Sequence, residues 1–152
     1  MIRSTEEPVT RMAKLLALLH YSMSKEIIAV LGEERGKEVV LSAIKKFGQA
    51  RAQSMLEEAR ERGLELNSLD TYRKVRDMPG TGWERDPSNP LKVTFCPMES
   101  VWAEYGEEGR KLGALYCSID HVLYGAFGAD LERPRCRALG DECCDFHPKP
   151  RK

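Results

Sequence analysis

The sequence predicts an α+β fold in which two long N-terminal helices pack on a four-stranded antiparallel sheet with an inserted helix. Two observations support this class. Through the first sixty positions, apolar residues recur at three- and four-residue steps, the spacing of one helix face. After Pro79-Gly80 the pattern changes to short strand-like segments that are separated by turn-forming residues. Helices first and strands later is the order typical of α+β proteins.

The two long helices are expected over residues 9–31 and 33–62. Gly32 separates them, and Gly63 follows the second helix at the position where glycine favours a C-terminal cap. Capping residues and the spacing of apolar residues predict three further helices. They are expected from about Asp70 to Pro79-Gly80, over residues 99–105, and over residues 107–127, where Gly128 ends the last one.

Four strands are expected in two hairpins, each marked by a cluster of turn-forming residues. Asp86-Pro87-Ser88-Asn89-Pro90 marks the first turn, and Leu139-Gly140-Asp141 marks the second. The first hairpin joins 81–85 to 92–96, and the second joins 131–137 to 142–147.

Length and charge limit the classes of function. A chain of 152 residues fits one domain, with residues 1–8 and 148–152 expected to be flexible tails. The 24 basic and 24 acidic residues cancel, so the basic surface of a nucleic-acid-binding protein is not expected. The sequence has no N-terminal targeting signal and no run of ~20 apolar residues, which predicts a cytoplasmic protein without a membrane partner. The apolar excess of the first helix predicts a homodimer.

All five cysteines lie in the C-terminal part of the chain. In a reducing compartment, an odd number of cysteines is typical of free thiols, metal ligands or a nucleophile rather than of a disulfide framework. They are Cys96, Cys117, Cys136, Cys143 and Cys144.

The helix expected over 107–127 places a chemically varied group beside its apolar face. At ~100° per residue, Arg110, Cys117, Asp120, His121 and Tyr124 share one arc of the helix. Cys117 and His121 are one turn apart, close enough for the imidazole to accept the thiol proton. The alternative is that Cys117 is a small buried hydrophobe and His121 a surface residue.

The final strand suggests a second cluster of thiols. Strand alternation places Cys144 on the same inward face as Phe146, and a hairpin centred on Gly140 places Cys136 opposite Cys144. These two thiols, completed by Cys96 or Cys117, form a candidate zinc site. Against zinc, the chain contains neither Cys-x-x-Cys nor His-x-x-x-His.

Most of the chain resembles the L-2-amino-thiazoline-4-carboxylic acid hydrolase family. The resemblance extends from about Leu31 to His147, and its most specific part is the final third. It is carried by Phe95-Cys96-Pro97, Leu112-Gly113-Ala114-Leu115-Tyr116-Cys117-Ser118-Ile119-Asp120, Gly125-Ala126-Phe127 and Gly140-Asp141-Glu142-Cys143-Cys144-Asp145-Phe146.

The resemblance implies a ring-opening hydrolysis at the amidine carbon of a small sulfur heterocycle. Chemistry then assigns candidate roles to residues of this chain. Cys117 attacks the amidine carbon, His121 or His147 transfers protons, and Asp120 orients the imidazole or holds the substrate amine.

Three further residues complete the candidate site. Arg110 is expected to bind the substrate carboxylate through two hydrogen bonds, and Tyr124 is a second substrate-binding candidate. Cys144 is the alternative nucleophile.

The ending Gly-Asp-x-x-Cys-x-Phe, with Gly109 and Gly113 before it, is also similar to the vinyl-reductase-type small-molecule-binding domain of bacterial sensors. That resemblance implies a ligand-binding or zinc-binding module without turnover, with Cys136 and Cys144 at the corresponding spacing. Three residues before Cys136, where the resemblance implies a carboxylate ligand for zinc, this chain has Arg133. A purely structural dimer is the third hypothesis.

Overall fold

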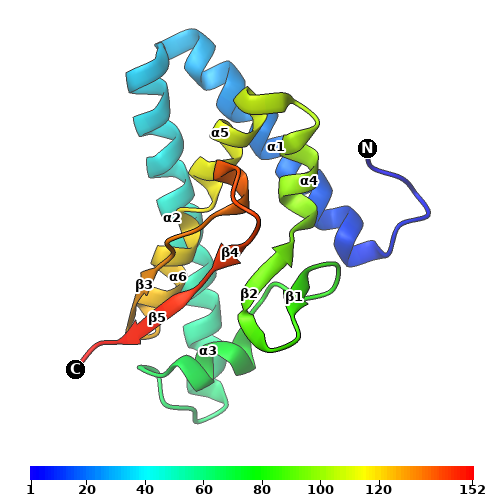
Figure 1. Cartoon of the computed structure of the whole chain (residues 1–152). Helices are drawn as coiled ribbons and strands as arrows, with labels where there is room; N and C mark the ends of the chain where they lie inside the picture. The colour runs from blue at the N-terminus through cyan, green and yellow to red at the C-terminus, as the bar shows by residue number, and fades with distance from the viewer.

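The computed structural model describes all 152 residues, and its first half is helical (Figure 1). Helix α1 spans Pro8–Leu31 and α2 spans Glu33–Glu61, which confirms the two long helices. The side chain of Glu7 caps α1 by accepting hydrogen bonds from the first backbone N–H groups of the helix. Gly32 joins the two helices at φ 83°, a conformation that other residues rarely adopt.

A short third helix follows α2. Helix α3 spans Leu69–Val75, and the hydroxyl of Ser68 accepts a hydrogen bond from the N–H of Thr71 at 3.4 Å. The helix ends four residues before the expected stop at Pro79, so residues 76–83 run as an irregular segment from α3 to the first strand.

The single helix expected over 107–127 is wrong, because the chain forms two helices there. Helix α4 spans Pro97–Ala103, α5 spans Gly106–Tyr116, and α6 spans Ile119–Ala126. The break between α5 and α6 has a local cause. The Ser118 hydroxyl donates to the carbonyl of Leu115 at 2.7 Å, and the hydrogen bonds there tighten to three-residue spacing.

The single four-stranded sheet is also wrong, because the strands form two small antiparallel sheets. The first sheet has the order β1-β2-β4, and the second pairs β3 with β5. The strands are β1 (Glu84–Asp86), β2 (Asn89–Phe95), β3 (Ala129–Glu132), β4 (Cys144–Asp145) and β5 (His147–Pro150).

The second expected hairpin forms only at its outer ends, where Glu132 pairs with His147, and its inner part contains a short 3₁₀ helix, η1 (Arg137–Leu139). The N–H of Cys136 donates to Oδ2 of Asp141 at 2.7 Å, which closes the turn locally. Strand β4 then pairs with β2, with Cys144 opposite Val93. The next strand, β5, pairs with β3, so residues 148–150 of the expected C-terminal tail belong to a sheet.

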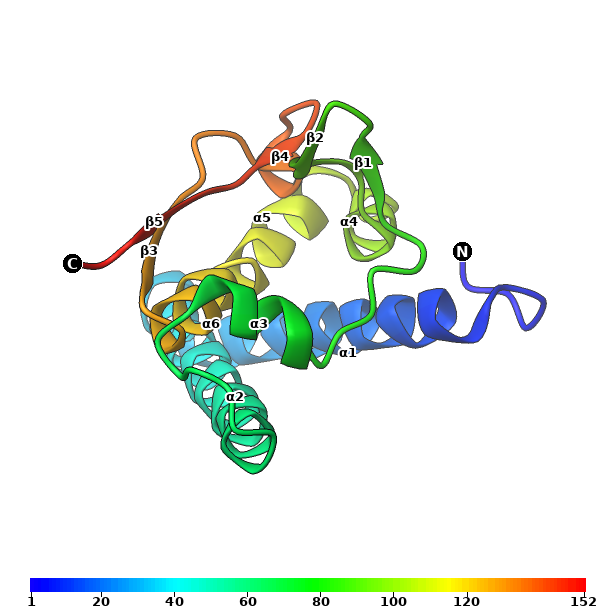
Figure 2. The same ribbon diagram turned by 90° about the horizontal axis from the view of Figure 1, so that it is seen from below.

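The core lies between the long helices and the later elements. Figure 2 shows α1 and α2 on one side, the strands β1, β2 and β4 on the other, and α4, α5 and α6 between them. Trp102 is 1% exposed, and its indole N–H donates to the carbonyl of Ala17 at 2.9 Å. Gly113 allows α5 to approach this ring, since a Cβ there would lie 2.2 Å from Trp102 Cδ2. His20 Nε2 lies 2.8 Å from the carbonyl oxygen of Leu112. These contacts fix α4 and α5 against α1.

None of the helices combines the length and the apolar composition that crossing a bilayer requires.

Candidate functional site

A cavity of about 730 Å³ lies where the irregular segment after α3, the first sheet and the break between α5 and α6 meet. This volume is within the range of small-molecule sites in proteins. Its walls are mainly apolar and aromatic. They include Tyr72, Trp83, Met98, Trp102, Ile119, Leu123 and Phe146.

Three thiols from three elements line this cavity. Cys96 precedes α4, Cys117 follows the last residue of α5, and Cys144 lies in β4. The structure therefore brings a thiol of the late helix and a thiol of the final strand to one enclosed space. Cys143 is also buried, but it does not line the cavity.

Cys136 is buried next to two of these thiols. The neighbouring thiols of Cys117 and Cys144, together with the positive charge of Arg133, lower the pKa of Cys136. Interaction with Cys136 and burial raise the pKa values of Cys117 and Cys144. These opposite shifts favour Cys136 as the thiol of the cluster that ionises first.

The guanidinium of Arg133 joins this cluster to the helix break. The side chain is 9% exposed, and Nη1 donates to Oδ2 of Asp120 at 2.5 Å. Both terminal nitrogens also donate to the carbonyl of Cys117 at 3.1 Å, and the group lies over the ring of Phe146 at 5.7 Å. Burial raises the pKa of Asp120, and the charge of Arg133 acts in the opposite direction.

The proposed zinc ligands do not fit a metal ion in this structure. No group of three or more His, Cys, Asp or Glu side chains has an arrangement that could hold one. The expected ligands Cys96, Cys136 and Cys144 do not form such a group. The permanent positive charge of Arg133 lies close enough to Cys136 and Cys144 to interact with both, and it would repel a cation there.

The remaining candidates on the late helix divide into two groups. Asp120 and Tyr124 line the cavity with Cys117. His121 is exposed and does not line it, although it is close enough to affect the pKa of Asp120. Arg110 also lies outside the cavity, where its Nε donates to the buried carboxylate of Glu99 at 3.3 Å.

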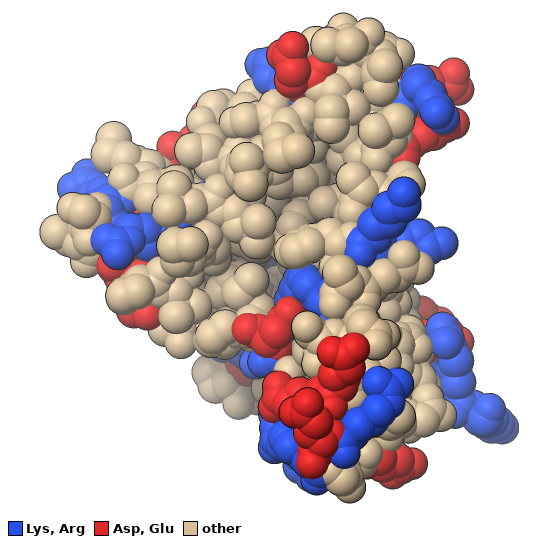
Figure 3. Space-filling model, turned by 180° about the vertical axis from the view of Figure 1, so that it is seen from behind, with Lys and Arg blue, Asp and Glu red and all other residues tan.

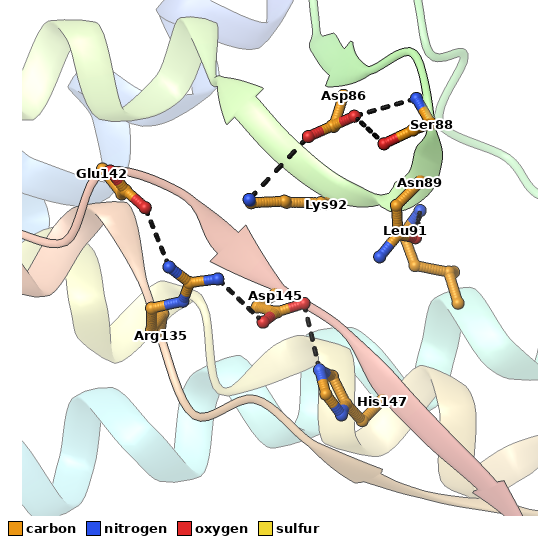
Figure 4. A network of polar contacts seen from close by, with 9 residues as sticks. All are labelled: Asp86, Ser88, Asn89, Leu91, Lys92, Arg135, Glu142, Asp145 and His147. Carbon is orange, nitrogen blue, oxygen red and sulfur yellow. Dashed lines mark hydrogen bonds and ion pairs between the residues drawn. The ribbon is translucent and has the colours of Figure 1, made fainter.

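His147 faces away from the cavity and belongs to a polar network on the outer side of β4 and β5 (Figure 4). Its Nε2 lies 3.0 Å from a carboxylate oxygen of Asp145, and the imidazole is half exposed. Arg135 links Asp145 to Glu142 in the same network. The structure therefore brings neither expected histidine to the thiols.

The sequence interpretation missed several polar side chains of the cavity. Arg76 and Arg85 line it from the irregular segment and from β1, where no periodic pattern marks them. Tyr116 also lines it, and its hydroxyl is buried without a hydrogen-bond partner. Burial raises the pKa of Tyr116 to about 12, so this hydroxyl remains protonated at neutral pH. The one available signal was the position of Tyr116 directly before Cys117 in the family motif.

The fold and the cavity define a small α+β protein with thiols at the border of an apolar site that also contains arginines. The family model for L-2-amino-thiazoline-4-carboxylic acid hydrolase matches residues 10–147, and the chain belongs to this family. Searches of curated proteins and of solved structures found no match. Family membership implies a hydrolase that acts on this small sulfur heterocycle.

Replacing Arg133 with glutamine tests its structural role. Arg133→Gln removes the cation that pairs with the partly buried Asp120, and we expect the free energy of unfolding to fall by about 1–3 kcal/mol. Urea unfolding at pH 7 measures this loss. Arg151→Gln removes an exposed pair with Asp130 and should cost less than about 1 kcal/mol. Equal losses in the two variants would contradict the role given to Arg133.

Proposed function

We propose that the protein opens the ring of 2-aminothiazoline-4-carboxylate by hydrolysis, with Cys117 as the nucleophile. The observation that carries this proposal is the position of Cys117. Its sulfur borders the cavity, and the positive charge of Arg133 next to it favours its ionised form. A cysteine attacks only as its thiolate, so a cation beside the thiol meets the first requirement of the reaction.

In the first step, the Cys117 sulfur adds to the amidine carbon of the ring, and its proton passes to an amidine nitrogen of the substrate. The bond from that carbon to the ring sulfur then breaks, and the ring sulfur takes the electron pair and that proton. Arg133 stabilises the negative charge that develops on Cys117 as its proton leaves.

In the second step, water adds to the same carbon, which is now bound to Cys117 as an isothiourea. The carbon–sulfur bond to the enzyme breaks, Cys117 regains a proton, and the ring-opened carbamoyl product leaves. Asp120 borders the cavity beside Cys117 and is placed to accept hydrogen bonds from the amidine nitrogens. One water is consumed, and the enzyme returns to its starting state.

This assignment changes the roles expected for the other candidates. An amidine nitrogen of the substrate takes the proton that His121 or His147 was expected to accept, because both histidines lie outside the cavity. Cys144 interacts with Cys136, and its sulfur accepts a hydrogen bond from the backbone N–H of Arg137 at 3.3 Å. Cys144 borders the cavity as well and is the alternative nucleophile.

Three cysteine variants separate these roles in an assay of ring opening. We expect Cys117→Ser to lower kcat at least ~10³-fold, since a serine hydroxyl ionises far less readily than a thiol. Cys144→Ser should lower it by only about tenfold, because the serine hydroxyl can still donate a hydrogen bond to Cys136. Cys143→Ala is the matched control, a buried thiol outside the cavity, and should keep kcat within about threefold of the wild-type value. A larger loss in Cys144→Ser than in Cys117→Ser would assign the nucleophile to Cys144.

A second candidate function is ligand binding without turnover. The observation that favours it is that no histidine lines the cavity, so the usual general base of a cysteine hydrolase is missing from the site. A wild-type protein that binds 2-aminothiazoline-4-carboxylate without converting it would support this candidate.

We further propose that the protein forms a homodimer through the outer face of α1. Figure 3 shows the molecule from behind, where a broad region over α1 carries few charged side chains. Met12 is 63% exposed, Leu19 is 55% exposed and Met23 is 56% exposed. An isologous dimer would bury this uncharged stripe against its own copy.

A charge placed within this stripe tests the dimer. We expect the wild-type protein to have twice the chain mass in light scattering after size exclusion, and Leu19→Lys to have the mass of one chain. Leu139→Lys, a change at an exposed leucine of η1, is the control and should remain dimeric. A monomeric wild-type protein would refute the dimer.

A further inference from the structure

Three arginines of the cavity, Arg73, Arg76 and Arg85, have no acidic partner. Arg73 lies in α3, Arg76 follows α3 directly and is exposed, and Arg85 lies in β1 and is partly buried. None of their guanidinium groups takes part in a hydrogen bond or an ion pair with another residue of the chain. Burial and the adjacent charge of Arg76 both lower the pKa of Arg85, and no carboxylate offsets them.

The guanidinium groups of Arg76 and Arg85 converge on one point of the cavity wall. A Cβ atom added to Gly80 would lie 3.4 Å from Nη2 of Arg76 and 3.8 Å from Nη2 of Arg85. Two like charges held near one another cost free energy unless an anion lies between them. This arrangement is therefore suited to an anionic group of a ligand.

The other two arginines of the cavity are paired. Arg51 donates to the carboxylate of Asp77 through Nε at 2.8 Å and through Nη2 at 2.6 Å. Arg133 is bound to Asp120. Their charges are neutralised within the protein, whereas those of Arg73, Arg76 and Arg85 are not. The unbalanced positive charge of the cavity therefore lies at the end formed by residues 73–85.

The opposite end of the cavity contains Asp120 and Cys117. Burial raises the pKa of Tyr124, Asp120 raises it further, and Arg76, Arg73 and Arg85 lower it, so this side chain is close to both ends. A ligand with a cationic amidine at one end and an anion at the other would match this polarity.

We infer that Arg76 and Arg85 form a carboxylate-binding subsite, which selects cyclic amidines that carry a carboxylate. The inference rests on the proposed function, since it orients the amidine carbon toward Cys117. The fork of a guanidinium presents two N–H groups to a carboxylate, and two such groups fix its position and its plane. The buried hydroxyl of Tyr116, which lacks a protein partner, is a further donor to the same ligand.

Tryptophan fluorescence can measure this binding without turnover. Both tryptophans of the chain, Trp83 and Trp102, line the cavity, so a bound ligand should change the emission. The probes are 2-aminothiazoline-4-carboxylate and its neutral 4-carboxamide, titrated into the Cys117→Ser protein. We expect the carboxylate to bind at least ~10-fold more tightly than the carboxamide.

Substitutions then assign the difference to the two arginines. Arg76→Gln and Arg85→Gln should each weaken binding of the carboxylate by about 10-fold, and the double variant by about 100-fold. Binding of the carboxamide should change by less than about threefold in each. Lys74→Gln is the matched control, because it removes a positive charge from α3 outside the cavity, and it should bind both probes as the parent does.

Three outcomes would overturn the inference. They are equal affinity of the parent for the two probes, unchanged affinity for the carboxylate in the double variant, and no binding of the carboxylate up to about 10 mM. Failure of the proposed function has a different signature. If Cys117→Ser still converts the substrate while Arg85→Gln selectively weakens the carboxylate, then the nucleophile is wrong and the subsite is retained.

Discussion

The buried guanidinium of Arg133 is the contact on which the site depends. It binds the carbonyl at the end of α5 and the carboxylate of Asp120 in α6, so it fixes the two helices on either side of their break. It also places a permanent positive charge next to three thiols. Removing this one group would leave a partly buried carboxylate, a free carbonyl and a buried thiolate without compensation.

The charge of Arg133 explains how the thiols can lie together. Three neutral thiols would need no cation, and three thiolates would repel one another. One thiolate on Cys136, with two neutral thiols and an arginine around it, is the arrangement that the pKa shifts of the three thiols favour. The sulfur atoms of Cys117 and Cys144 border the cavity. The same cation also gives a physical reason for the absence of a metal-binding arrangement at these cysteines.

The cavity has two polar ends of different chemistry, with an aromatic wall between them. The thiols and Asp120 lie at the helix break, and the unpaired arginines lie at the segment after α3. A small zwitterionic ring is the ligand that this arrangement favours. The family to which the chain belongs is named for such a compound.

The sequence predicted the local features of the fold well. The apolar spacing of α1 and α2 is strong and continuous, so both helices were predicted nearly to the residue. The break after Cys117 was not predictable from local pattern, because it contains neither glycine nor proline. One of its causes, Arg133, is sixteen residues further along the chain. The break also changes the helical phase, so His121 does not face Cys117 as one continuous helix would require.

The pairing of the strands was missed for a related reason. Gly140 does form a turn, at φ 97°, and β3 and β5 on its two sides pair with each other, but β4 between them pairs with β2. Such long-range pairing leaves no periodic signal in the sequence. Cys117, Asp120, Tyr124 and Cys144, which the sequence offered as site candidates, all line the cavity. Arg76 and Arg85 lie in segments without a pattern, so only the structure identifies them.

A pH titration of the ultraviolet absorbance of thiolate tests the central claim most directly. The account predicts that the folded protein contains about one thiolate at pH 6, well below the usual thiol pKa of 9.0. This absorbance should disappear on unfolding and in Cys136→Ala, and it should appear at higher pH in Arg133→Gln. A folded protein without thiolate absorbance until the pH approaches 9, or an identical titration in Arg133→Gln, would contradict the account.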